Sequence, residues 1–171
     1  MNDQTLMDVV DRMRNRFFGK YRGTVTAIDS NNIGRIKAKV PAVLGDDQDT
    51  GWCMPCVPYA GDQAAIAFLP EQGAGVWIEF EGGDVSYPIW VGCYWHDGEI
   101  PSLVAPDVKV IKTKANQQIV LNDKDKSITV SDGSGNSITM DKDGIAIKRE
   151  QGTIVIKNKN IKMNDDGMEV T

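Results

Sequence analysis

The stretch GTIVIKNKNIKMNDDGMEV, residues 152–170, alternates apolar with polar residues, breaks at Asn, Asp or Gly, and then repeats the pattern. Such alternation predicts short β-strands joined by tight turns. Apolar pairs with a one-residue gap recur at spacings of 7 to 10 residues at Ile119/Leu121, Ile128/Val130, Ile138/Met140, Ile145/Ile147, Ile154/Ile156, Ile161/Met163 and Met168/Val170. A repeat of strand and turn is typical of a solenoid-like β structure.

These repeats are too small to form a core within one chain. Each offers two apolar side chains, worth about 1.5–3 kcal/mol apiece when fully buried, whereas ordering eight residues costs on the order of 8–16 kcal/mol in backbone entropy. We therefore predict that residues 116–171 form an intertwined trimeric β-helix, or β-prism. Its predicted core is Ile119, Leu121, Ile128, Val130, Ile138, Met140, Ile145, Ile147, Ile154, Ile156, Ile161 and Met163. A β-meander folded back on the rest of the chain is the alternative.

Residues 21–104 also predict β structure, with no segment of helical period. YRGTVTAIDS and IGRIKAKVP alternate apolar with polar residues on either side of Ser30-Asn31-Asn32. Further strand candidates lie at about 52–58, 64–69, 74–81 and 86–95, with a turn expected at 59–62. Five or six short strands suit a small barrel of the OB type. Residues 105–115 show no clear repeat, and we expect them to form a linker.

Residues 1–20 are expected to carry a short amphipathic helix, at 3–18. Apolar residues recur there at three- and four-residue spacing, and Gly19 is a plausible stop. The stripe either caps the chain's own domain or docks on a partner, and the partner-facing candidates are Leu6, Val10, Met13 and Phe17. This charged segment does not match a signal peptide, and no segment approaches the ~18 apolar residues of a membrane span.

The charge distribution argues against a nucleic-acid partner. The formal net charge is −5, with +1 on residues 1–20, −7 on 21–104 and +1 on 105–171. An acidic barrel would repel phosphates instead of releasing counterions.

The residues needed for catalysis or metal binding are scarce. His96 is the single histidine, and no G-x-S-x-G motif occurs, so we expect no enzyme and no cofactor. Cys53-x-x-Cys56 and Cys93-x-x-His96 have the spacing of a Cys₃His zinc set. However, residues three apart on a strand point to opposite faces, and free cysteines pack as small hydrophobes. Buried thiols with a surface histidine are therefore the expected arrangement, in a reducing compartment.

GRIKAKVPAVLGD at 34–46, FLPEQGAGVWIEFEGGDVSYPIWVGCYWHDGEIP at 68–101 and the ITMDKDGIAI-type repeats together resemble the phage baseplate assembly protein V and VgrG spike family. The resemblance runs from about residue 20 to the end. It implies a homotrimeric central spike of a contractile injection system: a phage tail, a type VI secretion apparatus or an extracellular particle. The barrel would bind tube and hub proteins, and the prism would point at the target-cell membrane.

Two departures from that family qualify the expectation. The chain has no room for the lysozyme domain that some spikes carry, and MNDDGMEVT at its end lacks the His-x-His motif that binds iron in others. This end implies either a separate tip protein, such as a PAAR-type cone, or a simple termination of the shaft, and we expect the PAAR-type tip protein. The rival hypothesis is an OB-fold binding module for an oligosaccharide or other ligand, with Trp52, Trp77, Trp90 and Trp95 available for stacking.

Overall fold

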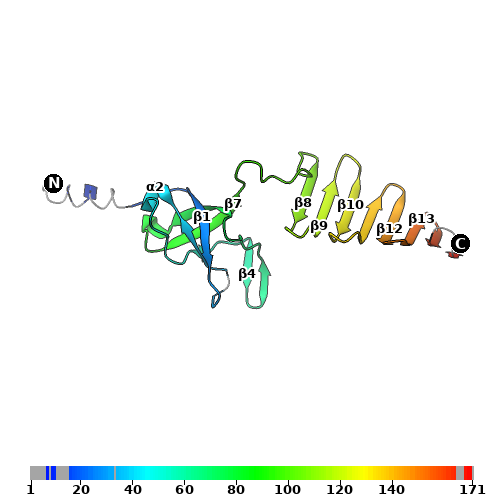
Figure 1. The fold of residues 1–171 in the computed structure, drawn as a ribbon, viewed down its shortest axis with the longest axis horizontal. Helices are drawn as coiled ribbons and strands as arrows, with labels where there is room; N and C mark the ends of the chain where they lie inside the picture. The colour runs from blue at the N-terminus through cyan, green and yellow to red at the C-terminus, as the bar shows by residue number, and fades with distance from the viewer. Residues whose placement is uncertain (1–6, 8, 11–15, 33, 165–167, 171) are drawn as a thin grey trace. The chain divides into compact units, whose positions relative to one another are not determined.

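The structure is a computed structural model that describes residues 7, 9–10, 16–32, 34–164 and 168–170. It divides into two compact units, Met1–Glu99 and Ile100–Thr171. The first unit contains a small barrel and a separate hairpin, and the second is a single antiparallel sheet (Figure 1). The all-β fold class is confirmed. None of the helices among the described residues has the length and apolar character needed to cross a membrane.

The barrel is a five-stranded sheet in the order β2-β1-β6-β7-β3. Its strands are β1 (Tyr21–Ile28), β2 (Ile36–Lys39), β3 (Met54–Pro55), β6 (Gly75–Phe80) and β7 (Pro88–Tyr94). Neighbours pair antiparallel except β3 and β7, which are parallel. The Cys53 N–H donates to the Ile36 carbonyl at 2.7 Å, and this bridge joins the two outer strands of the sheet. The sheet thereby closes on itself.

Alternation along these strands builds one core. Val25, Ile78 and their equivalents point inward from alternate positions, as the sequence pattern predicts. The buried apolar residues are Val25, Ile36, Ala38, Val40, Cys53, Val76, Ile78, Phe80 and Trp90. The Trp90 indole N–H donates to the Gly34 carbonyl at 2.7 Å, so its polar group is satisfied inside the core.

Short elements connect the barrel strands: α2 (Pro41–Leu44), the 3₁₀ turn η1 (Glu81–Gly83), and a separate hairpin of β4 (Tyr59–Gly61) and β5 (Ala64–Ile66). The turn expected at 59–62 is wrong, because Tyr59–Gly61 is strand β4. The chain reverses at Asp62-Gln63, where Gln63 has a positive φ of 56°.

The N-terminal helix lies largely outside the described residues, and Leu6 and Met13 of the partner-facing stripe are among those not described. Met7, Val9 and Val10 are helical and exposed. Phe17 is half-buried against the barrel core, with its ring centroid 6.3 Å from that of Phe80 and its N–H bonded to the Gly83 carbonyl. The assignment of Phe17 to a partner-facing surface is therefore corrected: it seals the barrel.

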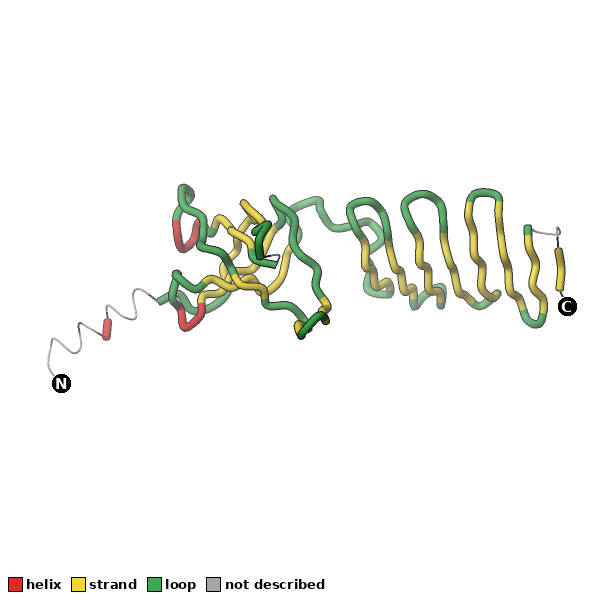
Figure 2. Tube along the Cα trace, turned by 90° about the horizontal axis from the view of Figure 1, so that it is seen from below, coloured by secondary structure: helices red, strands yellow, loops and turns green. Residues whose placement is uncertain are grey.

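The second unit is an eight-stranded sheet whose strands follow one another in sequence order from β8 to β15. They are β8 (Val108–Lys112), β9 (Gln118–Asn122), β10 (Ser127–Ser131), β11 (Ser137–Asp141), β12 (Gly144–Arg149), β13 (Gly152–Lys157), β14 (Asn160–Met163) and β15 (Met168–Val170). Figure 2 shows the chain running back and forth through successive hairpins.

The linker expected at 105–115 is too long, because β8 falls inside it. Lys109 of β8 pairs with Leu121 of β9, where the later strands have Ile or Met. A lysine thus replaces the first apolar residue of the repeat and hides this strand from a search for apolar pairs.

The winding of the strands also differs from the expectation of an intertwined helix. Each strand pairs with its sequence neighbours in the same chain, so the connectivity is that of a meander. The connections are short, and residues with positive φ such as Lys126, Glu150 and Asn158 reverse the chain at once. Such turns place the next strand beside the last one in the same sheet.

Candidate functional site on the eight-stranded sheet

Pairing between the strands aligns the apolar residues into two continuous rows on one side of the sheet. Val130 pairs with both Ile119 and Ile138, and Ile147 pairs with both Ile138 and Ile154. We call this side the apolar face. It carries all twelve predicted core residues together with Ile111 of β8: Ile111, Ile119, Leu121, Ile128, Val130, Ile138, Met140, Ile145, Ile147, Ile154, Ile156, Ile161 and Met163.

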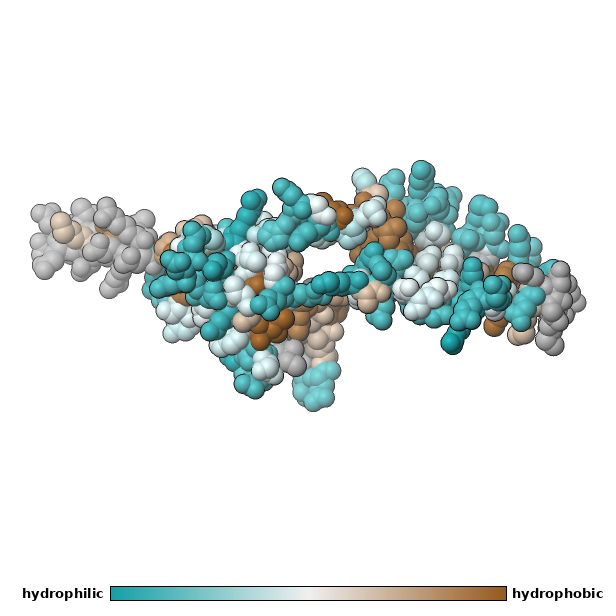
Figure 3. All heavy atoms as spheres, viewed as in Figure 1, coloured by the Kyte–Doolittle hydropathy of each residue, from teal (hydrophilic) through white to brown (hydrophobic). Residues whose placement is uncertain are grey.

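The apolar face is uncovered in a single chain. Eleven of the twelve predicted core residues are 36–44% exposed, and Ile154 is half-buried. In the view of Figure 3, hydrophobic side chains lie at the surface at the end of the sheet where β8 is found. An apolar surface that extends across seven strands is larger than single protein chains normally leave in water.

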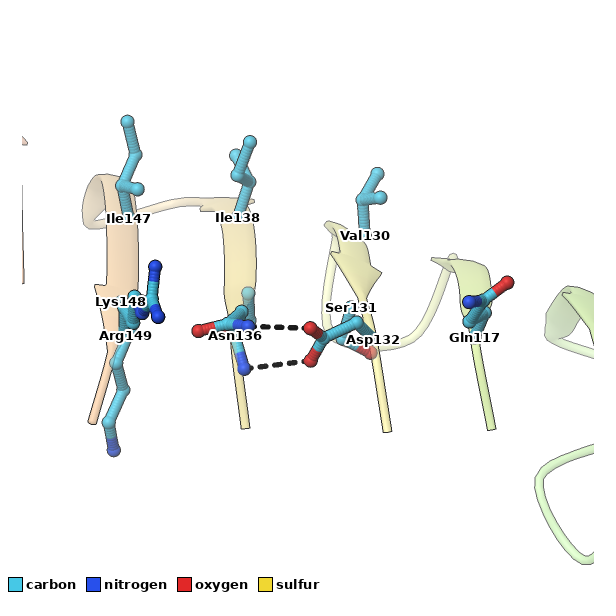
Figure 4. A pocket seen from close by; sticks show the side chains of 10 residues that line it. Gln117, Val130, Ser131, Asp132, Asn136, Ile138, Ile147, Lys148 and Arg149 are labelled. Atoms are coloured by element: carbon cyan, nitrogen blue, oxygen red, sulfur yellow. Dashed lines mark hydrogen bonds between the residues drawn. The ribbon is translucent and has the colours of Figure 1, made fainter. Parts of the chain in front are cut away.

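The apolar face is hollowed along one of its margins, across β10, β11 and β12. Val130, Ile138 and Ile147 point the same way from three neighbouring strands (Figure 4). They line a hollow of about 460 Å³ together with Gln117, Asp132, Asn136 and Arg149, among others. A hollow with aliphatic walls can accept side chains from another sheet.

A polar row borders the apolar face at one end of the strands. It consists of Gln117, Asp132, Asn136 and Arg149, each two residues beyond an apolar residue of its strand. Asp132 accepts hydrogen bonds from the Asn136 side-chain amide and from the N–H groups of Ser134 and Asn136. These bonds, the Asn136 side chain first, and the nearby Arg149 charge lower the pKa of the Asp132 carboxyl. The carboxylate therefore stays charged beside the aliphatic side chains.

Charged turns border the apolar face at the other end of the strands. Lys142 lies 2.9 Å and Lys157 3.8 Å from the Asp143 carboxylate, and Lys109 lies 3.7 Å from Asp123. The bond and charge of Lys142, followed by the charge of Lys157, lower the pKa of Asp143. The apolar face is thus an aliphatic stripe between two ionised margins.

The opposite face of the sheet has smaller and more polar side chains. Its middle row is Val110, Val120, Thr129, Thr139, Ala146 and Val155. Thr129 and Thr139 lie within hydrogen-bond distance of one another, 3.5 Å between their hydroxyl oxygens. Rows rich in Ser, Gln, Asn and Lys flank it, so this face suits contact with water.

The possible zinc ligands are not gathered into a metal site. Only Cys53 is buried, and its Sγ lies 3.2 Å from the Thr50 hydroxyl, while burial raises the pKa of the thiol. Cys56 and Cys93 are exposed, so the expectation of buried thiols is wrong for these two. Within the described ranges, no group of three or more His, Cys, Asp and Glu side chains is placed to hold a metal ion.

Three of the four tryptophans proposed as stacking groups are engaged within the barrel. Trp90 is in the core, the Arg22 guanidinium lies 5.7 Å from the Trp77 ring centroid, and the Lys37 ammonium lies 5.0 Å from that of Trp52. Tyr94 completes the Arg22 stack, 5.2 Å from Trp77. These contacts were not predicted, because nothing in the spacing of the residues shows which ones share the outer side of the barrel.

Two family comparisons cover both units. Residues 21–95 match the Type VI secretion system/phage-baseplate injector OB domain, and residues 108–169 match the phage baseplate V C-terminal trimerisation domain. No curated protein sequence matched the chain. The second match covers the strands that carry the apolar face, and it supports a homotrimer.

Proposed function

Because this chain belongs to the phage baseplate V family of structural baseplate proteins, we propose that it forms the homotrimeric central spike of a contractile injection system. The observation that carries the proposal is the apolar face, which no other part of unit Ile100–Thr171 covers among the described residues. Three copies supply the missing cover.

The energetic gain from such a cover is large. Eleven of the twelve predicted core residues are 36–44% exposed, so completing the burial of each contributes about 0.6–1.2 kcal/mol. Together they provide on the order of 10 kcal/mol per chain. That amount is comparable with the whole net stability of an ordinary domain, about 5–15 kcal/mol.

The trimer we propose has three whole sheets around one axis. Each sheet turns its apolar face inward and its opposite face toward water, and the polar and charged margins meet at the three edges. In a cyclic trimer the contact between neighbours is heterologous, so at each edge the polar row of one chain meets the charged turns of the next chain. Eight strands at a spacing of about 4.8 Å give a shaft of roughly 35 Å.

The mechanical role follows from this construction. Sheath contraction drives the tube forward, and a narrow shaft stiffened by ladders of backbone hydrogen bonds concentrates the force on a small area of the target-cell membrane. The barrel and the N-terminal helix face the tube and hub proteins, and a PAAR-type tip protein binds the far end of the shaft. The chain works in the virion tail or the assembled injection particle, without an enzymatic role and without binding nucleic acid.

A pair of substitutions on one strand tests the trimer. Ile154 lies on the apolar face of β13, and Val155, the next residue, lies on the opposite face. We expect Ile154→Asp to abolish the trimer, since it places three carboxylates inside the aliphatic core. Val155→Asp introduces the same charge into the same strand and should remain trimeric.

Light scattering on the two purified variants gives the answer. A trimeric, heat-resistant Ile154→Asp protein would contradict the proposed packing. Loss of the trimer in both variants would show only that β13 tolerates no charge. The comparison is then repeated without a charge on β12, with Ile147→Ser on the apolar face and Ala146→Ser on the opposite face.

A further inference from the structure

The β4–β5 hairpin, residues 58–69, is a separate part of the barrel unit. Its two strands pair with one another through Tyr59↔Ile66, Ala60↔Ala65 and Gly61↔Ala64, and they pair with no barrel strand. Figure 1 shows this hairpin, which we call the arm, standing out from the barrel strands. All twelve residues of the arm are exposed.

The arm is almost entirely apolar. Within residues 58–69 only Asp62 and Gln63, at its tip, are polar. Tyr59 is 53% exposed, Ile66 54%, Phe68 63% and Leu69 40%. An isolated two-stranded hairpin is marginally stable in water, and both of its edges offer unpaired backbone groups. The arm therefore needs a partner surface.

The size of the arm indicates what kind of partner it has. Its four large side chains expose on the order of 300 Å² together, judged from the area that each buries on full packing. Two proteins that meet as separate molecules need about 800 Å² on each side. The arm is too small for that, but it suffices for copies already held together, because the second contact is then intramolecular.

The chain supplies such a tether. Residues 100–107 join the barrel unit to β8, where the trimerisation domain begins. Eight extended residues span at most about 28 Å, so a trimer of the sheets keeps its three barrels at high effective concentration.

Charge favours the arm as the place where the barrels touch. Residues 21–104 carry a net charge of −7, of which the arm contributes only Asp62. Three such barrels repel one another over most of their surface. A nearly neutral apolar hairpin can make contact without opposing like charges.

We propose that the arm of each chain docks on the barrel of a neighbouring copy in the same trimer. This inference rests on the proposed trimer, and it adds a second contact between the chains that the sheets do not provide. The arms brace the barrels against one another where the hub proteins would bind.

Site-specific photocrosslinking in the full chain tests the docking. Benzoylphenylalanine replaces Phe68, a change of one aromatic residue for another, and a matched control carries it at Ser30, an exposed loop residue of the same barrel. Light scattering before irradiation establishes that the sample is trimeric. We expect the Phe68 variant to give dimer-sized bands whose cross-linked peptides join residue 68 to residues 16–99 of a second copy.

The outcomes separate the two proposals. A monomeric mass before irradiation refutes the trimer, and the arm contact with it. The arm contact is overturned, and the trimer left standing, if the mass is trimeric but residue 68 cross-links only within its own chain or only to residues 100–171. The same holds if the yield of dimer-sized bands from residue 68 does not exceed the yield from the control at residue 30.

A stability measurement gives a second readout. All four tryptophans, residues 52, 77, 90 and 95, lie in the barrel unit, so tryptophan fluorescence follows barrel unfolding alone. Phe68→Ser should lower the unfolding midpoint by several degrees in the trimer and leave it unchanged in an Ile154→Asp background. Equal shifts in both backgrounds would show that Phe68 packs within its own chain, and would overturn the proposal.

Discussion

Asp29 is a nearly buried carboxylate that organises the turn between β1 and β2. It accepts hydrogen bonds from the Asn31 and Asn32 N–H groups and from the Arg35 guanidinium, whose Nη2 lies 2.6 Å away. Burial by itself raises the pKa of Asp29, but these hydrogen bonds outweigh it and hold the pKa below its ordinary value. The charged form is therefore the one that stabilises the fold.

Asp29→Asn should lower the midpoint of thermal unfolding of the barrel by several degrees at pH 7. Because the folded pKa is lower than the unfolded value of about 3.9, the stabilisation by Asp29 is complete above that value and is lost as the pH falls further. The difference between the two proteins should thus be constant from about pH 5 to 8 and narrow below about pH 4. Tryptophan fluorescence measures both midpoints.

The matched control is Asp47→Asn, at an exposed carboxylate in the loop after α2. It removes the same charge without a buried partner, and its midpoint should stay within about a degree of the unchanged protein. Equal effects at residues 29 and 47 would mean that net charge, and not the turn, determines the loss.

Single residues also mark the limit of sequence-based prediction. The sequence shows that Phe17 is apolar and fits the period of the predicted helix. It does not show that Phe17 itself is non-helical and packs against the barrel core. Cys53 and Cys56 look equivalent in sequence, yet Cys53 is buried and Cys56 exposed, since strand position decides which of them faces inward. By contrast, the polar row could have been found, because Gln117 and Asp132 continue the period-two pattern beyond the apolar pairs.

At the scale of the element, the tight hairpins decide how the strands are connected. The alternation of residues predicts which side of each strand is apolar, and all twelve core candidates do share one face. The spacing of the repeats could not distinguish strands wound between chains from strands paired within one. That choice depends on the turn backbones, such as Glu150 at φ 52° and Gly144 at φ 140°.

Gly144→Ala tests the hairpin geometry. A Cβ on Gly144 would lie 2.0 Å from the Ile156 carbonyl oxygen of the paired strand β13, and the backbone is in the left-handed region. We expect the β12–β13 pairing to open and the free energy of unfolding to fall by about 3 kcal/mol or more. Chemical denaturation of the trimer, followed by circular dichroism, gives the value.

Gly152→Ala is the comparison within the same hairpin. Its Cβ would approach the Arg149 carbonyl at 3.3 Å, with no positive φ to strain the backbone. A loss of less than about 1 kcal/mol is expected. If both alanine variants lost the same free energy of unfolding, the close approach of the Gly144 and Ile156 backbones would not be what determines the geometry of this hairpin.

At the scale of the whole molecule, composition and period identified two β-rich parts with different architectures. The barrel and the repeat region were both predicted from alternation and turn residues. The boundary between them was not, because Lys109 interrupts the apolar rows in β8, the first strand of the sheet. The arm could not be predicted either, because the sequence pattern of a separate apolar hairpin is the same as that of two further strands of the barrel.

This division predicts how truncated chains should assemble. The full chain should have the mass of three 18.8 kDa copies, about 56 kDa, whereas a chain ending at residue 107 lacks the sheet and keeps the barrel and the arm. Since the arm is too small to hold separate molecules together, the shortened chain should be a folded monomer by light scattering and tryptophan fluorescence.

A chain ending at residue 115 retains β8 without its partner β9 and should aggregate more readily, because Val108, Val110 and Ile111 then lie on an open edge. A trimeric barrel without the sheet would show that the barrels alone carry the assembly, and would reverse the order of the two contacts proposed between the chains.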